Sequence, residues 1–155
     1  MHTLILGIGN TLLADEGIGV HVIQHLQTSQ NELPDTTLLD GGTLSFTLAG
    51  AIEAADNLIV IDAAQLHAQP GTVRTFIDED MDDFLHTNNK RSVHEVGLLD
   101  LMTIARLADH YPQRRALIGI QPQKLDWGEY PTEAVQAAIP SACHQIRNLL
   151  EGWRS

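Results

Sequence analysis

The chain has few of the features that mark secreted, nucleic-acid-binding or membrane-spanning proteins. It contains one cysteine, Cys143, so no disulfide can form within it, which is typical of proteins in a reducing cytoplasm. Nine Lys and Arg stand against twenty Asp and Glu, a net charge of -11, whereas phosphate binding needs clustered basic side chains. No apolar run approaches the roughly 20 residues that span a bilayer, and the first residues lack a secretory-signal pattern. We therefore expect a cytoplasmic protein without nucleic-acid or membrane partners.

The length and the apolar pattern predict one α/β domain over residues 1–155. Strands are expected at 3–8, 36–39, 58–62, 72–77 and 115–120, the fourth as an edge strand. Helices are expected at 17–28, about 44–54, 95–109 and 132–150, with Pro140 kinking or splitting the last. Residues 78–93 read as a long polar loop. Alternating strands and helices indicate a mostly parallel sheet covered by helices.

Polar side chains follow several of these strands at the point where each strand ends. Glu16 follows the first strand, Asp40 follows the second, Asp62 closes the third, and His94 stands just before a helix. Because ligands of such sheets bind beyond the carboxyl ends of the strands, we expect these segments to converge there.

Glu16, Asp62 and His94 together suit a divalent first-row metal, with positions left open for substrate or water. Each residue alone has an ordinary structural explanation, such as capping a turn or opening a helix. The spacing of zinc proteases does not apply, because a second His is needed at position 98, where Leu98 stands.

Glycines after the first strand leave a dinucleotide-binding module open as an alternative. The fingerprint is incomplete, since Leu12 stands where its third glycine belongs. Carboxylates at Asp15 and Glu16 would also compete with a phosphate for the amides of a helix N-terminus. The segment Asp40-Gly41-Gly42-Thr43 predicts a glycine turn or a loop whose backbone approaches a ligand closely.

Five segments in order resemble the nickel–iron hydrogenase maturation endopeptidases over nearly the whole chain. They are residues 7–20, Asp40-Gly41-Gly42-Thr43, Ile61-Asp62-Ala63, His94-Glu95-Val96-Gly97-Leu98 and Gly119-Ile120-Gln121-Pro122. The resemblance implies a three-layer α/β/α sandwich with a five-stranded twisted sheet, in which residues 72–77 form the one antiparallel strand. Either carboxylate of the Asp15-Glu16 pair is compatible with the family pattern.

The resemblance further implies an enzyme that removes a short C-terminal extension from the large-subunit precursor of a nickel–iron hydrogenase. Its metal-contacting positions correspond to Glu16, Asp62 and His94, and its recognition loop to Asp40, Gly41, Gly42 and Thr43. The nickel would come with the precursor, so we expect no permanent cofactor. Because the sequence shows no unusually apolar surface stripe, we expect a monomer that binds its client transiently.

For the cutting step we favour direct attack by water. Nickel could polarise the scissile carbonyl or lower the pKa of the water, or Asp40 could act as general base. A non-catalytic nickel chaperone of the precursor stays open as an alternative. Trp127 either packs at the edge of the core or contacts the client.

Overall fold

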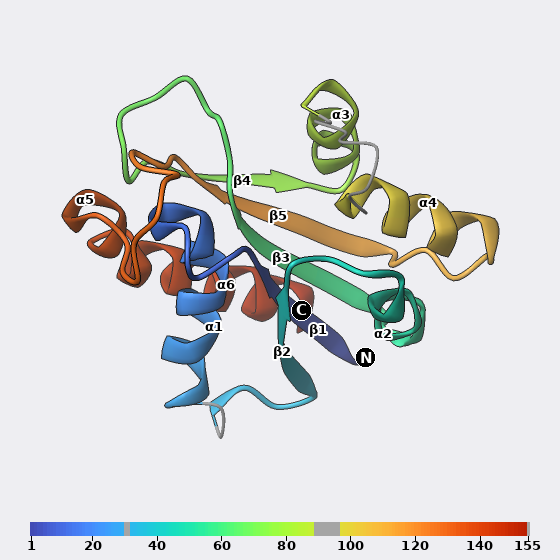
Figure 1. Cartoon of the computed structure of the whole chain (residues 1–155). Coiled ribbons are helices and arrows are strands. Elements are labelled where there is room, and N and C mark those ends of the chain that lie inside the picture. The colour runs from blue at the N-terminus through green and yellow to red at the C-terminus, as the bar shows by residue number, and fades with distance from the viewer. Residues whose placement is uncertain (30–31, 89–96, 155) are drawn as a thin grey trace.

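The computed structural model describes residues 1–29, 32–88 and 97–154 and contains a five-stranded sheet with helices on both faces (Figure 1). The strands are β1 (Thr3–Ile8), β2 (Thr36–Gly42), β3 (Asn57–Ala63), β4 (Val73–Ile77) and β5 (Arg114–Ile120), in the spatial order β2-β1-β3-β5-β4. β4 alone runs antiparallel, paired with β5 from Val73↔Ile120 to Ile77↔Ala116. The predicted sandwich and its antiparallel edge strand are confirmed.

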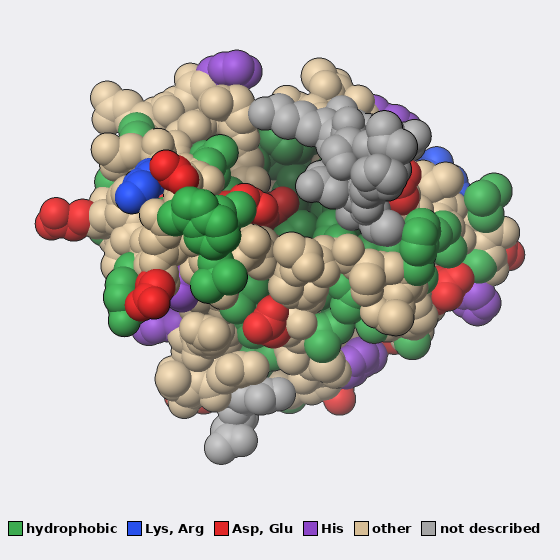
Figure 2. All heavy atoms as spheres, in the orientation of Figure 1, with side chains coloured by type: hydrophobic (Ala, Val, Ile, Leu, Met, Phe, Trp, Pro, Cys, Tyr) green, Lys and Arg blue, Asp and Glu red, His purple; other side chains and the backbone are tan. Residues whose placement is uncertain are grey.

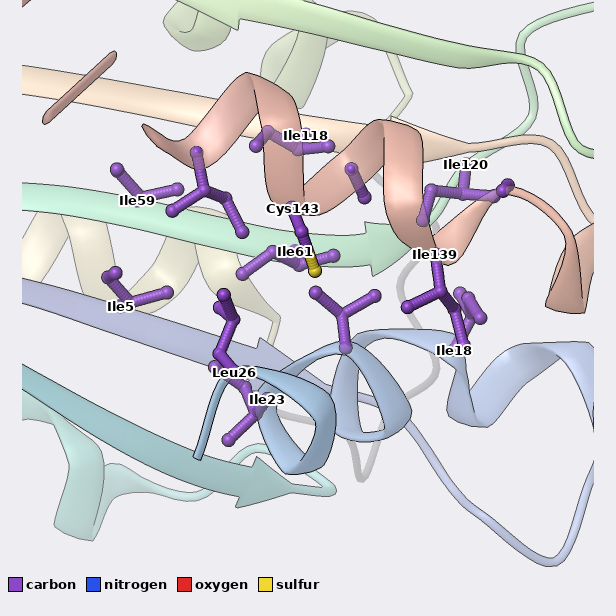
Figure 3. Close-up of a cluster of buried hydrophobic side chains, with 14 of the residues drawn as sticks. Ile5, Ile18, Ile23, Leu26, Ile59, Ile61, Ile118, Ile120, Ile139 and Cys143 are labelled. Atoms are coloured by element: carbon purple, nitrogen blue, oxygen red, sulfur yellow. The ribbon is translucent and has the colours of Figure 1, made fainter. Parts of the chain in front are cut away.

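Alternating side chains along the central strands build two separate cores, one on each face of the sheet. On β3, Ile59 and Ile61 point to one face and Leu58 and Val60 to the other, as expected of a strand buried on both sides. The first face is covered by α1 (Ile18–Gln27), α5 (Glu133–Gln136) and α6 (Ile139–Arg154). Figure 3 shows this core, with Cys143 of α6 lying among isoleucines of the strands and of α1.

The second face is covered by α2 (Ala49–Ala54), α3 (Glu79–Thr87) and α4 (Leu98–Leu107). The expected long loop at 78–93 is therefore wrong for its described part, because α3 occupies it. Met81 of α3 is fully buried, and Phe84 and Leu85 pack against the same core. Arg115 of β5 holds α3 against the sheet, because its guanidinium donates two hydrogen bonds to the Asp82 carboxylate, at 2.9 and 2.6 Å. An amphipathic face of three residues was masked by the acidic residues around it.

Two further boundaries differ from those expected. β2 continues through Asp40 to Gly42, where a turn was predicted, and its register against β1 slips from Gly7↔Asp40 to Ile8↔Gly42. The expected helix at 44–54 begins as a 3-10 turn, η3 (Phe46–Leu48). Pro140 splits the last helix as predicted, because it stands in the first turn of α6, where its missing N–H costs nothing.

Among the described residues, no helix is long and apolar enough to cross a membrane.

Candidate active site

A cavity of about 850 Å³ opens at the carboxyl end of β1 and β3, and both expected carboxylates face it. Glu16 reaches it from η1 (Ala14–Gly17), the 3-10 turn between β1 and α1, and Asp62 from the end of β3. The space-filling view shows the hollow with hydrophobic side chains in its floor and acidic ones beside it (Figure 2). The sequence prediction that these two segments converge is thus met by the structure.

Glu16 owes its position to close contact between the η1 turn and β1. Gly9 has φ +139°, and a Cβ there would lie 1.9 Å from the backbone oxygen of Glu16. The Gly9 N–H also donates to the Gly42 oxygen at 2.8 Å, which joins the turn to the end of β2. Glycine at this position therefore lets three chain segments meet beside the cavity.

Asp62 is held in an unfavourable environment for a carboxylate. Burial raises its pKa well above the usual value, the Ala63 N–H opposes that shift, and the charge on Glu16 raises the pKa further. Two carboxylates close enough to repel each other in a partly dry site are well suited to a cation, which would stabilise both charges.

Asp15 and Glu16 have different roles, although the sequence left either one as a ligand. Asp15 is fully buried, and its Oδ2 accepts hydrogen bonds from the N–H groups of Gln123 and Lys124, both at 2.8 Å. Thr132 donates to the same carboxylate through its N–H at 2.6 Å and through its hydroxyl. Burial alone would raise the pKa of Asp15, but these donors outweigh it and lower the pKa. Asp15 is a structural clamp between the β1–α1 loop and the β5–α5 loop.

The third expected ligand, His94, lies outside the described residues. Within the ranges that the structure describes, no three His, Cys, Asp or Glu side chains gather into a metal site. Gly97, three residues after His94 in the sequence, lines the cavity together with Leu98 and Leu99 of α4. His94 as the third ligand stays a prediction.

The predicted recognition loop contributes unequally to the cavity. Gly42 and Thr43 line it, whereas Asp40 and Gly41 are not among the lining residues. Asp40 is exposed, and its Oδ1 accepts the Gly42 N–H at 2.8 Å. Gly42 itself has φ +50°, the left-handed conformation that favours glycine. In this geometry, Asp40 shapes the loop that carries Gly42 and Thr43.

Sequence reasoning missed the apolar wall of the cavity and one buried amide. The wall comes from Leu44, Phe46, Phe84, Leu85 and Leu117, together with the α4 residues above. Gln121 is 6% exposed, and its Oε1 accepts the Leu66 N–H at 2.7 Å, so it anchors the segment that leaves β3 after Asp62. The spacing of the apolar residues within 79–87 was the signal that could have revealed part of the apolar wall. For Gln121 the sequence offered no signal beyond the segment Gly119-Ile120-Gln121-Pro122.

Gly7, which with Gly9 suggested the dinucleotide alternative, serves packing together with Gly19. A Cβ on Gly19 of α1 would lie 2.2 Å from the Ile61 oxygen and 2.5 Å from the Ile8 oxygen. A Cβ on Gly7 would meet the Gly19 oxygen at 2.2 Å. These contacts bring α1 against the backbones of β1 and β3, which explains Gly7 and Gly19 without a phosphate.

Comparison with known proteins assigns the chain to a family. The model of the hydrogenase maturation protease family matches residues 20–149. The chain belongs to this family. The matched range contains Asp62 and His94 and begins after Glu16.

Individual relatives agree with the assignment. The chain is 37% identical over 151 residues to the hydrogenase expression/formation protein HupD of Rhizobium leguminosarum bv. viciae, covering 97% of this chain and 74% of that protein. It is 36% identical over 148 residues to the hydrogenase 2 maturation protease of Escherichia coli, covering 94% and 88%. The structure of the hydrogenase maturating endopeptidase HybD from E. coli superposes with a TM-score of 0.86 at 32% identity, over 98% of this chain and 93% of that one. This member of the hydrogenase maturation protease family is therefore a peptidase.

Proposed function

We propose that this hydrogenase maturation protease removes the C-terminal extension from the large-subunit precursor of a nickel–iron hydrogenase after nickel has been inserted. The precursor-bound nickel is the recognition signal, and it enters the site as part of the substrate. Glu16, Asp62 and His94 are its contacts on the enzyme. The protein needs no resident cofactor in this proposal.

The observation that carries the proposal is the pairing of Glu16 and Asp62 in one cavity. Burial and the charge of Glu16 both raise the pKa of Asp62. When both carboxylates are ionised, their repulsion therefore destabilises the folded enzyme on its own. A divalent cation delivered by the substrate offsets this cost. A precursor without nickel lacks that favourable interaction, and the resulting difference in affinity selects the loaded form.

The rest of the cavity suits a peptide segment. Its apolar side, formed by residues such as Leu44, Phe46 and Leu98, can hold aliphatic side chains of the segment next to the scissile bond. The Gly42–Thr43 backbone on another side is free of a bulky side chain at Gly42 and can approach an extended main chain. The chain's own residues thus orient a peptide beside the two carboxylates.

Direct attack by water is the cutting step that we favour. Nickel bound to the precursor can polarise the scissile carbonyl or acidify the attacking water. Asp40 as general base is the weaker option, because its carboxylate is exposed, lies outside the cavity lining and is engaged by the Gly42 N–H.

The test is release of a C-terminal peptide from the nickel-loaded precursor, read by mass spectrometry beside the nickel-free precursor. A fragment from the loaded form alone is the expected result. Cleavage of both forms would contradict nickel as the signal. Binding without any fragment would favour the chaperone alternative.

Variants of the two carboxylates sharpen this experiment. Glu16→Gln and Asp62→Asn should abolish peptide release while the circular dichroism spectrum stays that of the wild type. Asp80→Asn is the matched control, because Asp80 is an exposed acid of α3 outside the cavity lining. Processing at the wild-type rate by the folded Asp62→Asn variant would remove Asp62 from the mechanism.

A further inference from the structure

Exposed apolar side chains concentrate on two loops beside the cavity. Leu12 of the β1–α1 loop is 55% exposed, and Leu125, Trp127 and Tyr130 of the β5–α5 loop are 54%, 71% and 76% exposed. We call these four residues the apolar rim. They account for half of the eight large hydrophobic side chains that are exposed in the described part of the chain. Trp127, which could have packed at the edge of the core, instead faces solvent.

The two loops are joined into one unit. The Gly128 N–H donates to the Leu12 oxygen at 3.0 Å, and the Ala14 N–H donates to the Gly128 oxygen at 2.8 Å. The Asp15 carboxylate adds the bonds to Gln123, Lys124 and Thr132 described above. A surface held in this way loses little conformational entropy when a partner binds.

The apolar rim is continuous with the site. Leu125 belongs both to the rim and to the cavity lining. In Figure 2, hydrophobic side chains with charged ones beside them lie over the loops that Figure 1 draws between β1 and α1 and between β5 and α5, next to the hollow. A protein whose terminal segment enters the cavity beside Leu125 can therefore rest on this rim.

The charges around the rim indicate the chemistry of the partner. Asp126 and Glu129 are exposed between the rim residues, Lys124 is the one basic residue in 121–132, and the chain carries a net charge of -11. Exposed Trp and Tyr are residues that dominate binding energy when a partner covers them, and their rings stack well on Arg. The matching surface is apolar and bears Arg or Lys.

We propose that the apolar rim docks the folded body of the hydrogenase large-subunit precursor, at an apolar patch of that body flanked by basic side chains. The docking is distinct from the capture of the C-terminal segment in the cavity. It rests on the proposed function, because the occupant is the precursor whose segment the cavity receives.

The test is steady-state processing of the nickel-loaded precursor by the Trp127→Ala/Tyr130→Ala double variant. KM should rise at least tenfold while kcat stays within about twofold, because docking precedes the cutting step. Leu107→Ala is the matched control, since Leu107 is 82% exposed at the end of α4, outside the rim. Its KM should equal that of the wild type. Asp126→Lys/Glu129→Lys should raise KM as well, and added salt should weaken wild-type binding.

The outcomes separate this inference from the proposed function. Failure of the wild type to release peptide contradicts the proposed function itself. Normal wild-type processing with an unchanged KM in the double variant overturns the docking alone, as does a loss confined to kcat. A wild-type dimer in sedimentation that the double variant abolishes would make the rim a contact between two copies of this chain and would also overturn the proposal.

Discussion

Asp15 and Glu16 are adjacent acids with opposite surroundings. The carboxylate of Asp15 is surrounded by N–H and O–H donors that lower its pKa, whereas Glu16 faces a cavity that it shares with Asp62. The position of one determines that of the other, because the Asp15 N–H also donates to the Lys124 oxygen at 3.0 Å. A carboxylate with a structural role therefore holds the neighbouring functional one in place.

We expect Asp15→Ala to destabilise the fold strongly. It leaves the N–H groups of Gln123, Lys124 and Thr132 without their acceptor, and each buried unpaired donor costs about 1–3 kcal/mol.

The pKa of Asp15 is lowered in the folded wild type, so the stability of the wild type should depend on pH. The contribution of Asp15 to the free energy of unfolding is present above pH 3.8 and is lost as the pH falls through the pKa of the folded state. Urea denaturation at pH 7 and pH 3 measures both effects. A variant as stable as the wild type at pH 7 would contradict the role of the clamp.

Asp62→Asn should have the opposite effect on stability. Because the pKa of Asp62 is raised in the folded state, the unfolded chain loses this proton first as the pH rises above 3.8, which favours unfolding at neutral pH. The amide removes that penalty, so the variant should melt at a higher temperature at pH 7. The advantage should shrink toward zero as the pH approaches 3.8.

Thermal melts of Asp62→Asn between pH 4 and pH 8 measure this advantage, with Asp80→Asn reporting the effect of removing any one surface charge. A melting temperature equal to or below that of the wild type at pH 7 would show that Asp62 is not strained by its environment.

At the scale of elements, the strands and most helices followed from the sequence, because their apolar residues repeat with the periods of a strand or helix. β3 is the clearest case, since Leu58 to Ile61 are all fully buried. The helix α3 did not follow, because five acidic residues between 78 and 83 hide the three apolar residues Met81, Phe84 and Leu85. The slip in register near Gly41 depends on pairing with β1, which no local pattern encodes.

The site was predictable to a similar extent. That Glu16 and Asp62 would meet followed from the rule for carboxyl ends of parallel strands. The division of work between Asp15 and Glu16 depends on the loop at 123–132, which is more than 100 residues away in sequence, so no local pattern could reveal it.

Gly19→Ala tests how tightly α1 must lie on the sheet. Its new Cβ would fall 2.2 Å from the Ile61 oxygen, and backbone atoms of a central strand cannot move aside cheaply. We expect a loss of at least about 3 kcal/mol in the free energy of unfolding. Gly50→Ala is the control, because a Cβ in α2 there meets nothing within 4 Å, and it should gain about 0.5–1 kcal/mol. Urea denaturation of both variants decides the point, and equal stabilities would show that α1 has room to shift.

At the scale of the whole molecule, the two cores share the strands between them. Ile59 and Val60 of β3 are successive residues that belong to opposite cores, so neither core can dissolve without disturbing the other. The expectation that residues 1–155 form one domain therefore predicts a single cooperative transition.

Trp127→Phe makes this prediction measurable. The variant keeps Trp153 as its only tryptophan, and Trp153 packs against the core between the sheet, α1 and α6. Trp153 fluorescence and far-ultraviolet circular dichroism should give the same urea midpoint. Two separate midpoints would show that the faces of the sheet unfold independently.

The location of Cys143 has a practical consequence for mapping the client on this enzyme. Cys143 is 7% exposed between α6 and the sheet, and burial raises the pKa of its thiol, so the thiol should resist alkylation in the native state. A cysteine introduced at Leu12 or Tyr130 would then be the reactive thiol of the native protein, with no native residue to remove first. A photoreactive maleimide attached there would mark the part of the precursor that lies over each loop.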